Sequence, residues 1–194
     1  MRNLKLIPRD KDIEHMSREV RPIYAQAFFT VSPGFILYYL IFDYYDPLGY
    51  YELIMRHEDL FNNEIIKLAT NMQSFLNNEE VIVNNVRVKP RVDMIDIGFR
   101  GSKYRPYIVF LIRFLAPIRI GKNVYENRYE SEIAQYDYVA YWSFPPRSKI
   151  LEVKVGESYD ILHNNLLVLY GKKGMRTLGY ERIVFEIQES ASFK

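Results

Sequence analysis

Acidic side chains recur at short intervals in the segment 125–133. Read as a strand, this segment places Glu126, Glu130 and Glu132 on one face, with Arg128 among them. Residues two apart on a strand face lie about 7 Å apart, which suits paired acid and base carboxylates or an oxygen-rich Mg²⁺ or Ca²⁺ site. A solvated, half-exposed strand also carries charge at alternate positions, and we favour that simpler interpretation.

A second candidate is a loop at 99–107 in which cations alternate with aromatic rings. It contains Arg100, Lys103, Tyr104 and Arg105. Cations can hold phosphates while rings stack on bases, which is how single-stranded nucleic acids are often bound. A basic hairpin tip is the simpler interpretation of the same residues.

A third candidate is the glycine-punctuated loop at 171–179, which follows an apolar strand. Its cations are Lys172, Lys173 and Arg176, and together with backbone N–H groups they could cradle a phosphate. The loop lacks the GxxxxGK[ST] spacing of a nucleotide-binding P-loop, so solvated lysines on a hairpin are the simpler interpretation. If this loop met the 99–107 loop at one sheet edge, nucleic-acid binding would gain support.

A histidine near a carboxylate and an amide is the last chemical candidate. Asp160, His163 and Asn164 have the residue types of a general base and its neighbours. No GxSxG motif accompanies them, so a serine hydrolase has no support, and we favour a histidine in a loop or at a strand end.

The composition narrows the chemistry further. Cysteine is absent, which excludes disulfides, thiolate metal sites and cysteine nucleophiles, and the three histidines are widely spaced. We therefore expect no cofactor. Basic residues number 26 and acidic residues 24, a balance that does not by itself indicate a polyanionic partner. The lack of Cys and the few Gln resemble thermophile composition.

Aromatic residues are the unusual feature of the composition. The chain has 17 Tyr and 12 Phe among 194 residues, and these residue types favour half-buried pleated surfaces. The length indicates a single domain, 1–194, without repeats or a linker. The first residues have no apolar core of a signal peptide, so we expect a cytoplasmic protein.

Segment 22–42 is 21 residues long and uncharged, yet it does not read as a membrane helix. Pro33-Gly34 forms a turn signal at its middle, so we predict strands at 23–31 and 35–42 and no membrane contact. A helix is predicted at 57–76, where apolar residues recur with a period near 3.6. Asn84-Asn85 suits a two-residue hairpin turn.

The remaining segments are predicted mainly as strands. The pattern changes phase near Met94-Ile95, which predicts a bulge. Leu151, Val153 and Val155 are expected to face inward. The predicted strands comprise 50–55, 81–83, 86–88, the segment that carries the bulge, 107–120, 125–133, 137–144, 150–155, 166–170 and 183–187.

These elements predict an α+β fold with a curved, mainly antiparallel sheet of about nine strands packed on one main amphipathic helix at about 57–76. A β-sandwich with one helix is the alternative. We expect a non-enzymatic binding module for a small apolar ligand or a protein partner, because such a sheet leaves an aromatic groove. Alternatives are single-stranded nucleic-acid binding and metal-assisted hydrolysis. Self-association through sheet edges is expected in each case.

Overall fold

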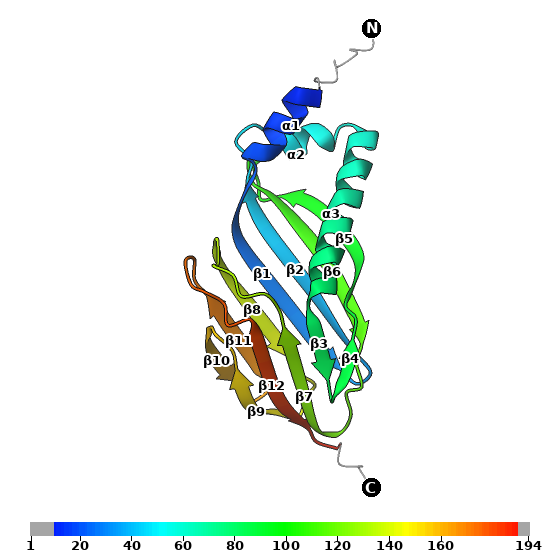
Figure 1. Cartoon of the computed structure of the whole chain (residues 1–194), viewed down its shortest axis with the longest axis vertical. Coiled ribbons are helices and arrows are strands. Elements are labelled where there is room, and N and C mark those ends of the chain that lie inside the picture. Colours follow the sequence, from blue (N-terminus) through cyan, green and yellow to red (C-terminus); the bar gives the residue numbers. More distant parts are fainter. Residues whose placement is uncertain (1–9, 190–194) are drawn as a thin grey trace.

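Strands dominate the chain and form two sheets that share one core (Figure 1). The computed structural model describes residues 10–189, and over this range it has twelve strands and three helices. The α+β class and the mainly antiparallel pairing are thereby confirmed. The helices are α1 (Asp10–Glu19), α2 (Tyr50–Ile54) and α3 (Glu58–Asn78).

The larger sheet has seven strands and one parallel pair, β1 with β8; its other neighbours are antiparallel. In order across the sheet these strands are β10 (Ser158–Leu162), β11 (Leu166–Gly171), β8 (Asp137–Ser143), β1 (Arg21–Ser32), β2 (Phe35–Tyr45), β6 (Pro106–Leu115) and β5 (Arg91–Phe99).

The smaller sheet has five antiparallel strands. In order they are β4 (Val86–Val88), β3 (Glu80–Val83), β7 (Gly121–Arg128), β12 (Tyr180–Ile187) and β9 (Ser148–Lys154). Only Lys89 and Pro90 separate β4 from β5, so the chain passes from one sheet to the other in two residues.

Several expectations about the elements need correction. The strand count of about nine is too low, the strands form two sheets, and the single main helix is not confirmed because α1 and α2 accompany α3. The predicted strand at 50–55 is wrong, since this segment forms α2. Asp46 explains the difference: its carboxylate oxygens accept hydrogen bonds from the backbone N–H groups of Tyr50 and Tyr51 at 3.0 and 2.9 Å.

The predictions for the turns, for segment 22–42 and for the bulge agree with the structure. Asn84 and Asn85 have φ angles of 49° and 65° in the β3–β4 turn, as the predicted two-residue hairpin requires. The 22–42 segment forms β1 and β2, and within residues 10–189 no helix is long and apolar enough to cross a membrane. The predicted bulge lies between Val92 and Met94.

One facing prediction is wrong. Leu151 is 46% exposed, whereas Ile150 is buried at 7%. The register between β9 and β12 shifts between Val184 and Phe185 of β12. The alternation of inward-facing and outward-facing side chains therefore changes phase within β9.

The two sheets contact each other through aromatic rings. Trp142 on β8 is stacked on Phe29 of β1 at 3.9 Å between ring centroids, and Tyr125 of the smaller sheet packs on it at 4.8 Å. Phe144, the residue that follows β8, makes a second contact, with Phe185 of the smaller sheet at 4.6 Å between ring centroids. Here the arrangement resembles the β-sandwich alternative.

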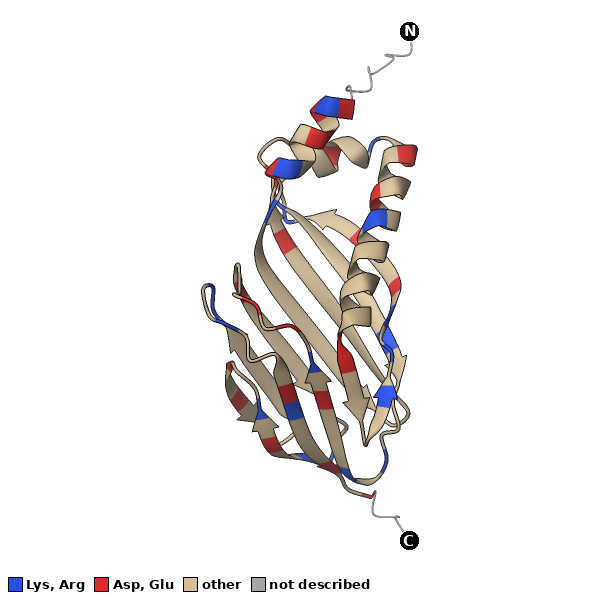
Figure 2. Cartoon of the chain, in the orientation of Figure 1, with Lys and Arg blue, Asp and Glu red and all other residues tan. Residues whose placement is uncertain are grey.

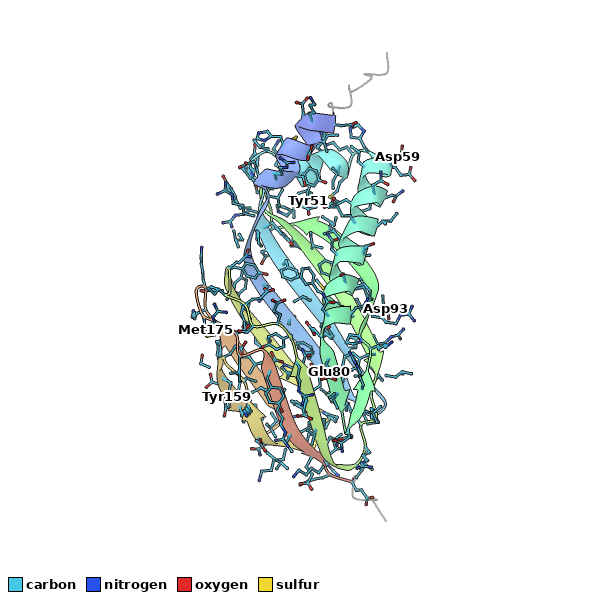
Figure 3. All side chains as sticks on the ribbon, viewed as in Figure 1. Tyr51, Asp59, Glu80, Asp93, Tyr159 and Met175 are labelled. Carbon is cyan, nitrogen blue, oxygen red and sulfur yellow. The ribbon has the colours of Figure 1, made fainter. Side chains whose placement is uncertain are left out.

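Helix α3 covers the part of the larger sheet that the smaller sheet leaves open (Figure 1). Gln73 fixes its C-terminal half: its Oε1 accepts the Val92 N–H at 3.0 Å and its Nε2 donates to the Pro90 carbonyl at 3.1 Å. Figure 3 shows Asp59 at one end of this helix and Glu80 where the chain enters β3. The helix therefore ends where the smaller sheet begins.

We expect Phe29→Leu to lower the free energy of unfolding by about 1–2 kcal/mol, because it removes a half-buried ring that packs on the core and is stacked on Trp142. Phe28→Leu is the matched control, since Phe28 lies on the opposite face of β1 and is 39% exposed; its effect should be about 0.5 kcal/mol. Urea unfolding followed by circular dichroism measures both, and equal losses would contradict the assigned facing.

Candidate functional site

A groove lies between the C-terminal half of α3 and the two sheets. Its deep part encloses about 260 Å³ and reaches buried residues such as Val81 and Tyr125. Its outer part, about 460 Å³, reaches exposed residues such as Ile133. The two parts have six lining residues in common, so they form one continuous groove. These residues are Leu40, Met72, Phe75, Glu79, Tyr138 and Thr177.

The walls of the groove are mostly apolar and aromatic. Alternate residues of the larger sheet point to its inner face, which supplies Phe29, Tyr38 and Leu40, and α3 supplies Met72 and Phe75. Figure 2 shows that the central strands of the larger sheet are almost free of charged residues. An apolar molecule entering the groove would therefore meet rings and aliphatic chains along most of its length.

Three carboxylates gather in the deep part, each from a different element. Glu79 follows the last residue of α3, Glu157 precedes β10, and Glu181 is the second residue of β12. Each accepts one hydrogen bond: from Asn127 Nδ2 at 3.0 Å, from the Tyr138 hydroxyl and from the Tyr129 hydroxyl at 3.4 Å, respectively. Neither part of the groove has a Lys, Arg or His among its described lining residues.

Two buried acceptor atoms in the deep part have no hydrogen-bond partner. They are Glu157 Oε2 and Asn127 Oδ1, and the two residues are only 7% and 8% exposed. Buried polar atoms are nearly always paired, because an unpaired acceptor loses its bonds to water without replacement. Each of these atoms is therefore able to accept a hydrogen bond that the protein itself does not supply.

Burial raises the pKa of two of these carboxyl groups, those of Glu79 and Glu181. Burial, together with the charges of Glu157 and Glu79, raises the pKa of Glu181 to about 8. Burial also raises the pKa of Glu79, although the hydrogen bond from Asn127 opposes the change. Like charges in an apolar setting cannot all ionise freely, so this end of the groove holds a proton at neutral pH.

The basic residues predicted in the 99–107 loop lie in the β5–β6 connection. Arg100 forms an ion pair with Asp43 of β2 at 3.0 Å, and Lys103 forms one with Glu52 of α2 at 3.0 Å. Arg105 borders a separate surface pocket beside Asp43, and Tyr104 is 44% exposed.

The second basic loop connects β11 to β12, where Figure 3 labels Met175. Lys172 Nζ lies 3.5 Å from Asp137, and the Lys173 backbone N–H donates to the same carboxylate at 2.8 Å. Arg176 forms an isolated bridge with Ile133.

The two basic loops meet the same end of the larger sheet. Asp43 and Asp137 flank Tyr24 in register, one on each side of β1, so the carboxylates that pair with Arg100 and Lys172 lie two strands apart. The structure thus brings the loops near one another, although acidic partners offset part of their charge.

The acidic segment does not form the expected row. Strand β7 ends at Arg128, so Glu130 and Glu132 lie beyond it, while Glu126 accepts a hydrogen bond from the Tyr180 hydroxyl at 2.6 Å. Among residues 10–189, no group of three or more His, Cys, Asp or Glu side chains is placed to hold a metal ion. His163 lies in the β10–β11 turn, where its backbone has the left-handed conformation with φ 50° that the turn requires.

The three glutamates of the deep groove were missed by sequence reasoning, because they are spread from Glu79 to Glu181. One signal was available. Glu181 has the same parity on β12 as Ile183, Phe185 and Ile187, which are all buried. A carboxylate on the buried face of an alternating strand indicates a special environment.

We expect stability to fall as pH rises from about 5 to about 9. Below the ordinary pKa of 4.5, Glu181 is protonated in both the folded and the unfolded chain; between 4.5 and about 8 only the folded chain holds the proton, so unfolding becomes easier. The loss is roughly 1.4 kcal/mol per unit of pKa difference at most. Glu181→Gln should flatten this dependence in thermal melts, and Glu186→Gln, on the other face of β12, should not. A pH dependence unchanged in Glu181→Gln would contradict the assignment.

No family model matches the chain, and no curated protein matches it. Among solved structures, the chain is similar to yeast LTA4 hydrolase in complex with bestatin, at 9% sequence identity and a TM-score of 0.35. The alignment covers 90% of this chain but only 30% of the hydrolase chain. A likeness at this level carries no argument about function, so the interpretation depends on the groove itself.

Proposed function

We propose that this protein is a non-enzymatic binding module that holds a small, largely apolar molecule in the groove between α3 and the two sheets. The observation that carries the proposal is the lining: rings and aliphatic side chains from both sheets and the helix surround a space with a few polar groups, including three carboxylates at its deep end. Small-molecule sites in proteins commonly have this composition.

Elements that fix the walls support the same proposal. The Tyr138 ring lies directly over Gly171, where an added Cβ would be 2.1 Å from ring atoms. The absence of a side chain at Gly171 therefore lets the Tyr138 ring occupy this position, and the hydroxyl of that ring donates a hydrogen bond to Glu157. A wall held in this way does not need to rearrange before binding, which reduces the entropy lost on association.

We expect Phe75→Ala to weaken binding of the neutral fluorophore N-phenylnaphthylamine by about tenfold or less, because the ring borders both parts of the groove. Ile66→Ala is the control: both side chains are on α3 and 64% exposed, but Ile66 does not line the groove. Fluorescence titration measures both affinities. Absence of binding by the wild-type protein, or equal loss in both variants, would contradict the proposal.

A second candidate is binding of single-stranded nucleic acid to the outer face of the larger sheet. It is favoured by the approach of the two basic loops to one end of that sheet. On the same face Phe28, 39% exposed, stacks on Tyr141 at 5.0 Å, which offers rings for bases. The ion pairs of Arg100 and Lys172 weigh against it, since a phosphate would have to compete with Asp43 and Asp137.

For this second candidate, the affinity for a labelled single-stranded oligonucleotide should fall steeply as salt is added. Arg100→Ala or Lys173→Ala should reduce the slope of log affinity against log salt by about one. Lys122→Ala, on β7 of the smaller sheet, should leave the slope unchanged. Fluorescence anisotropy measures the slopes, and no binding at low salt would eliminate the candidate.

A further inference from the structure

We propose that the molecule held in the groove is an amphiphilic organic cation, with an ammonium group among Glu79, Glu157 and Glu181 and an apolar body along α3. This inference rests on the proposed function, because it assigns a chemical class to the ligand of the same groove. It adds a charge and an orientation to a ligand so far described only as largely apolar.

Charge balance is the first step of the argument. Three carboxylates line the deep part and no basic side chain accompanies them among the described lining residues. Glu157 is buried and Glu79 and Glu181 are half-buried, and carboxylates withdrawn from water in this way are ordinarily paired with a cation or with several donors. Each of these three has a single protein donor, from Asn127, Tyr138 or Tyr129. A cationic ligand would supply the positive charge that no protein side chain provides beside these carboxylates.

Hydrogen-bonding capacity is the second step. The two buried atoms without partners, Glu157 Oε2 and Asn127 Oδ1, are both acceptors. A carboxylate ligand brings only acceptors and would leave them unpaired. An ammonium group has up to three N–H donors and no acceptor, so its hydrogen-bonding capacity matches unpaired acceptors of this kind.

The surroundings also favour positive charge. Glu79 lies at the C-terminal end of α3, the negative end of the helix dipole, and the last turn of α3 has no basic residue. The rings of Tyr38, Tyr125 and Tyr129 line the same space. Aromatic faces attract ammonium groups through their quadrupoles, most strongly where water is excluded.

The outer part of the groove sets the shape of the ligand. Leu40, Phe42 and Met72 make much of its lining apolar, Glu132 and Gln135 also border it, and it continues directly from the acidic end. A compact metal ion would occupy the carboxylates and leave this apolar surface unused. A molecule with a cationic head and a hydrocarbon body fills both parts, and burial of the body adds hydrophobic stabilisation.

The test uses three probes with the same eight-carbon chain: octylammonium, octanol and octanoate. Isothermal titration calorimetry of the full chain near neutral pH should show octylammonium binding at least about tenfold more tightly than octanol, with octanoate weakest. If octanol and octanoate bind as well as octylammonium, the proposed function stands and the cation inference fails. If none of the three binds, the proposed function fails as well.

Variants locate the charge recognition. Glu157→Gln and Glu181→Gln keep side-chain size and should each weaken octylammonium binding by roughly tenfold to a hundredfold while leaving octanol affinity nearly unchanged. Glu186→Gln makes the same change on the other face of β12 and should have no effect. Equal losses for octylammonium and octanol, in variants that melt like the wild type, would overturn the inference. If a variant fails to fold, the probe series on the wild-type chain still decides.

A proton balance gives an independent readout. Glu181 faces Glu157, Glu79 and Tyr129, and none of these groups is a cation. An ammonium group that settles among them should ionise Glu181 and release a proton near neutral pH, seen as binding heats that change with the ionisation enthalpy of the buffer. Binding without proton release would count against contact with Glu181. Mg²⁺, Ca²⁺ or Mn²⁺ displacing octylammonium through Glu157 would instead indicate a metal site and overturn the inference.

Discussion

The aromatic contact at Trp142 fixes where the two sheets pack against each other, and the position of α3 and of the groove follows from it. Phe29 and Tyr125 approach this indole from the two sheets, so the sheets lie close together at that point. Farther along the larger sheet, α3 takes the place of the smaller one (Figure 1). The helix and the smaller sheet meet the same inner face without filling the space between them, and the groove lies at this boundary.

The boundary explains why polar groups collect in an otherwise apolar interior. The end of a helix, the start of β12 and the segment before β10 all converge there, and each brings a glutamate. A protein that needed only stability at these positions would gain from apolar side chains of similar volume. The three carboxylates, one of them with a pKa raised to about 8, are the part of this interior that the proposed binding of a ligand would explain.

Much of the fold followed from local patterns, and the site did not. The period of apolar residues identified α3, and Asn84-Asn85 identified its hairpin, because both depend on neighbours in the chain. Helix α2 was mistaken for a strand because its tyrosines favour strands, whereas the deciding contact is the carboxylate of Asp46. Glu79 and Glu181 are about a hundred positions apart, and only strand pairing brings them together.

The parallel pairing of β1 with β8 has a consequence for the order in which the molecule assembles. Strand β1 pairs with β2 at once, but its other edge remains unpaired until Asp137–Ser143 has been synthesised, after β2, β5 and β6 of the same sheet and three of the five strands of the smaller sheet. Contacts between such distant segments form slowly, and an unsatisfied edge invites pairing with other chains. Until β8 pairs with this edge, Phe29 has no Trp142 ring to stack on. Before that pairing, the nascent chain is therefore prone to aggregate through β1, the strand that later packs at the centre of the interior.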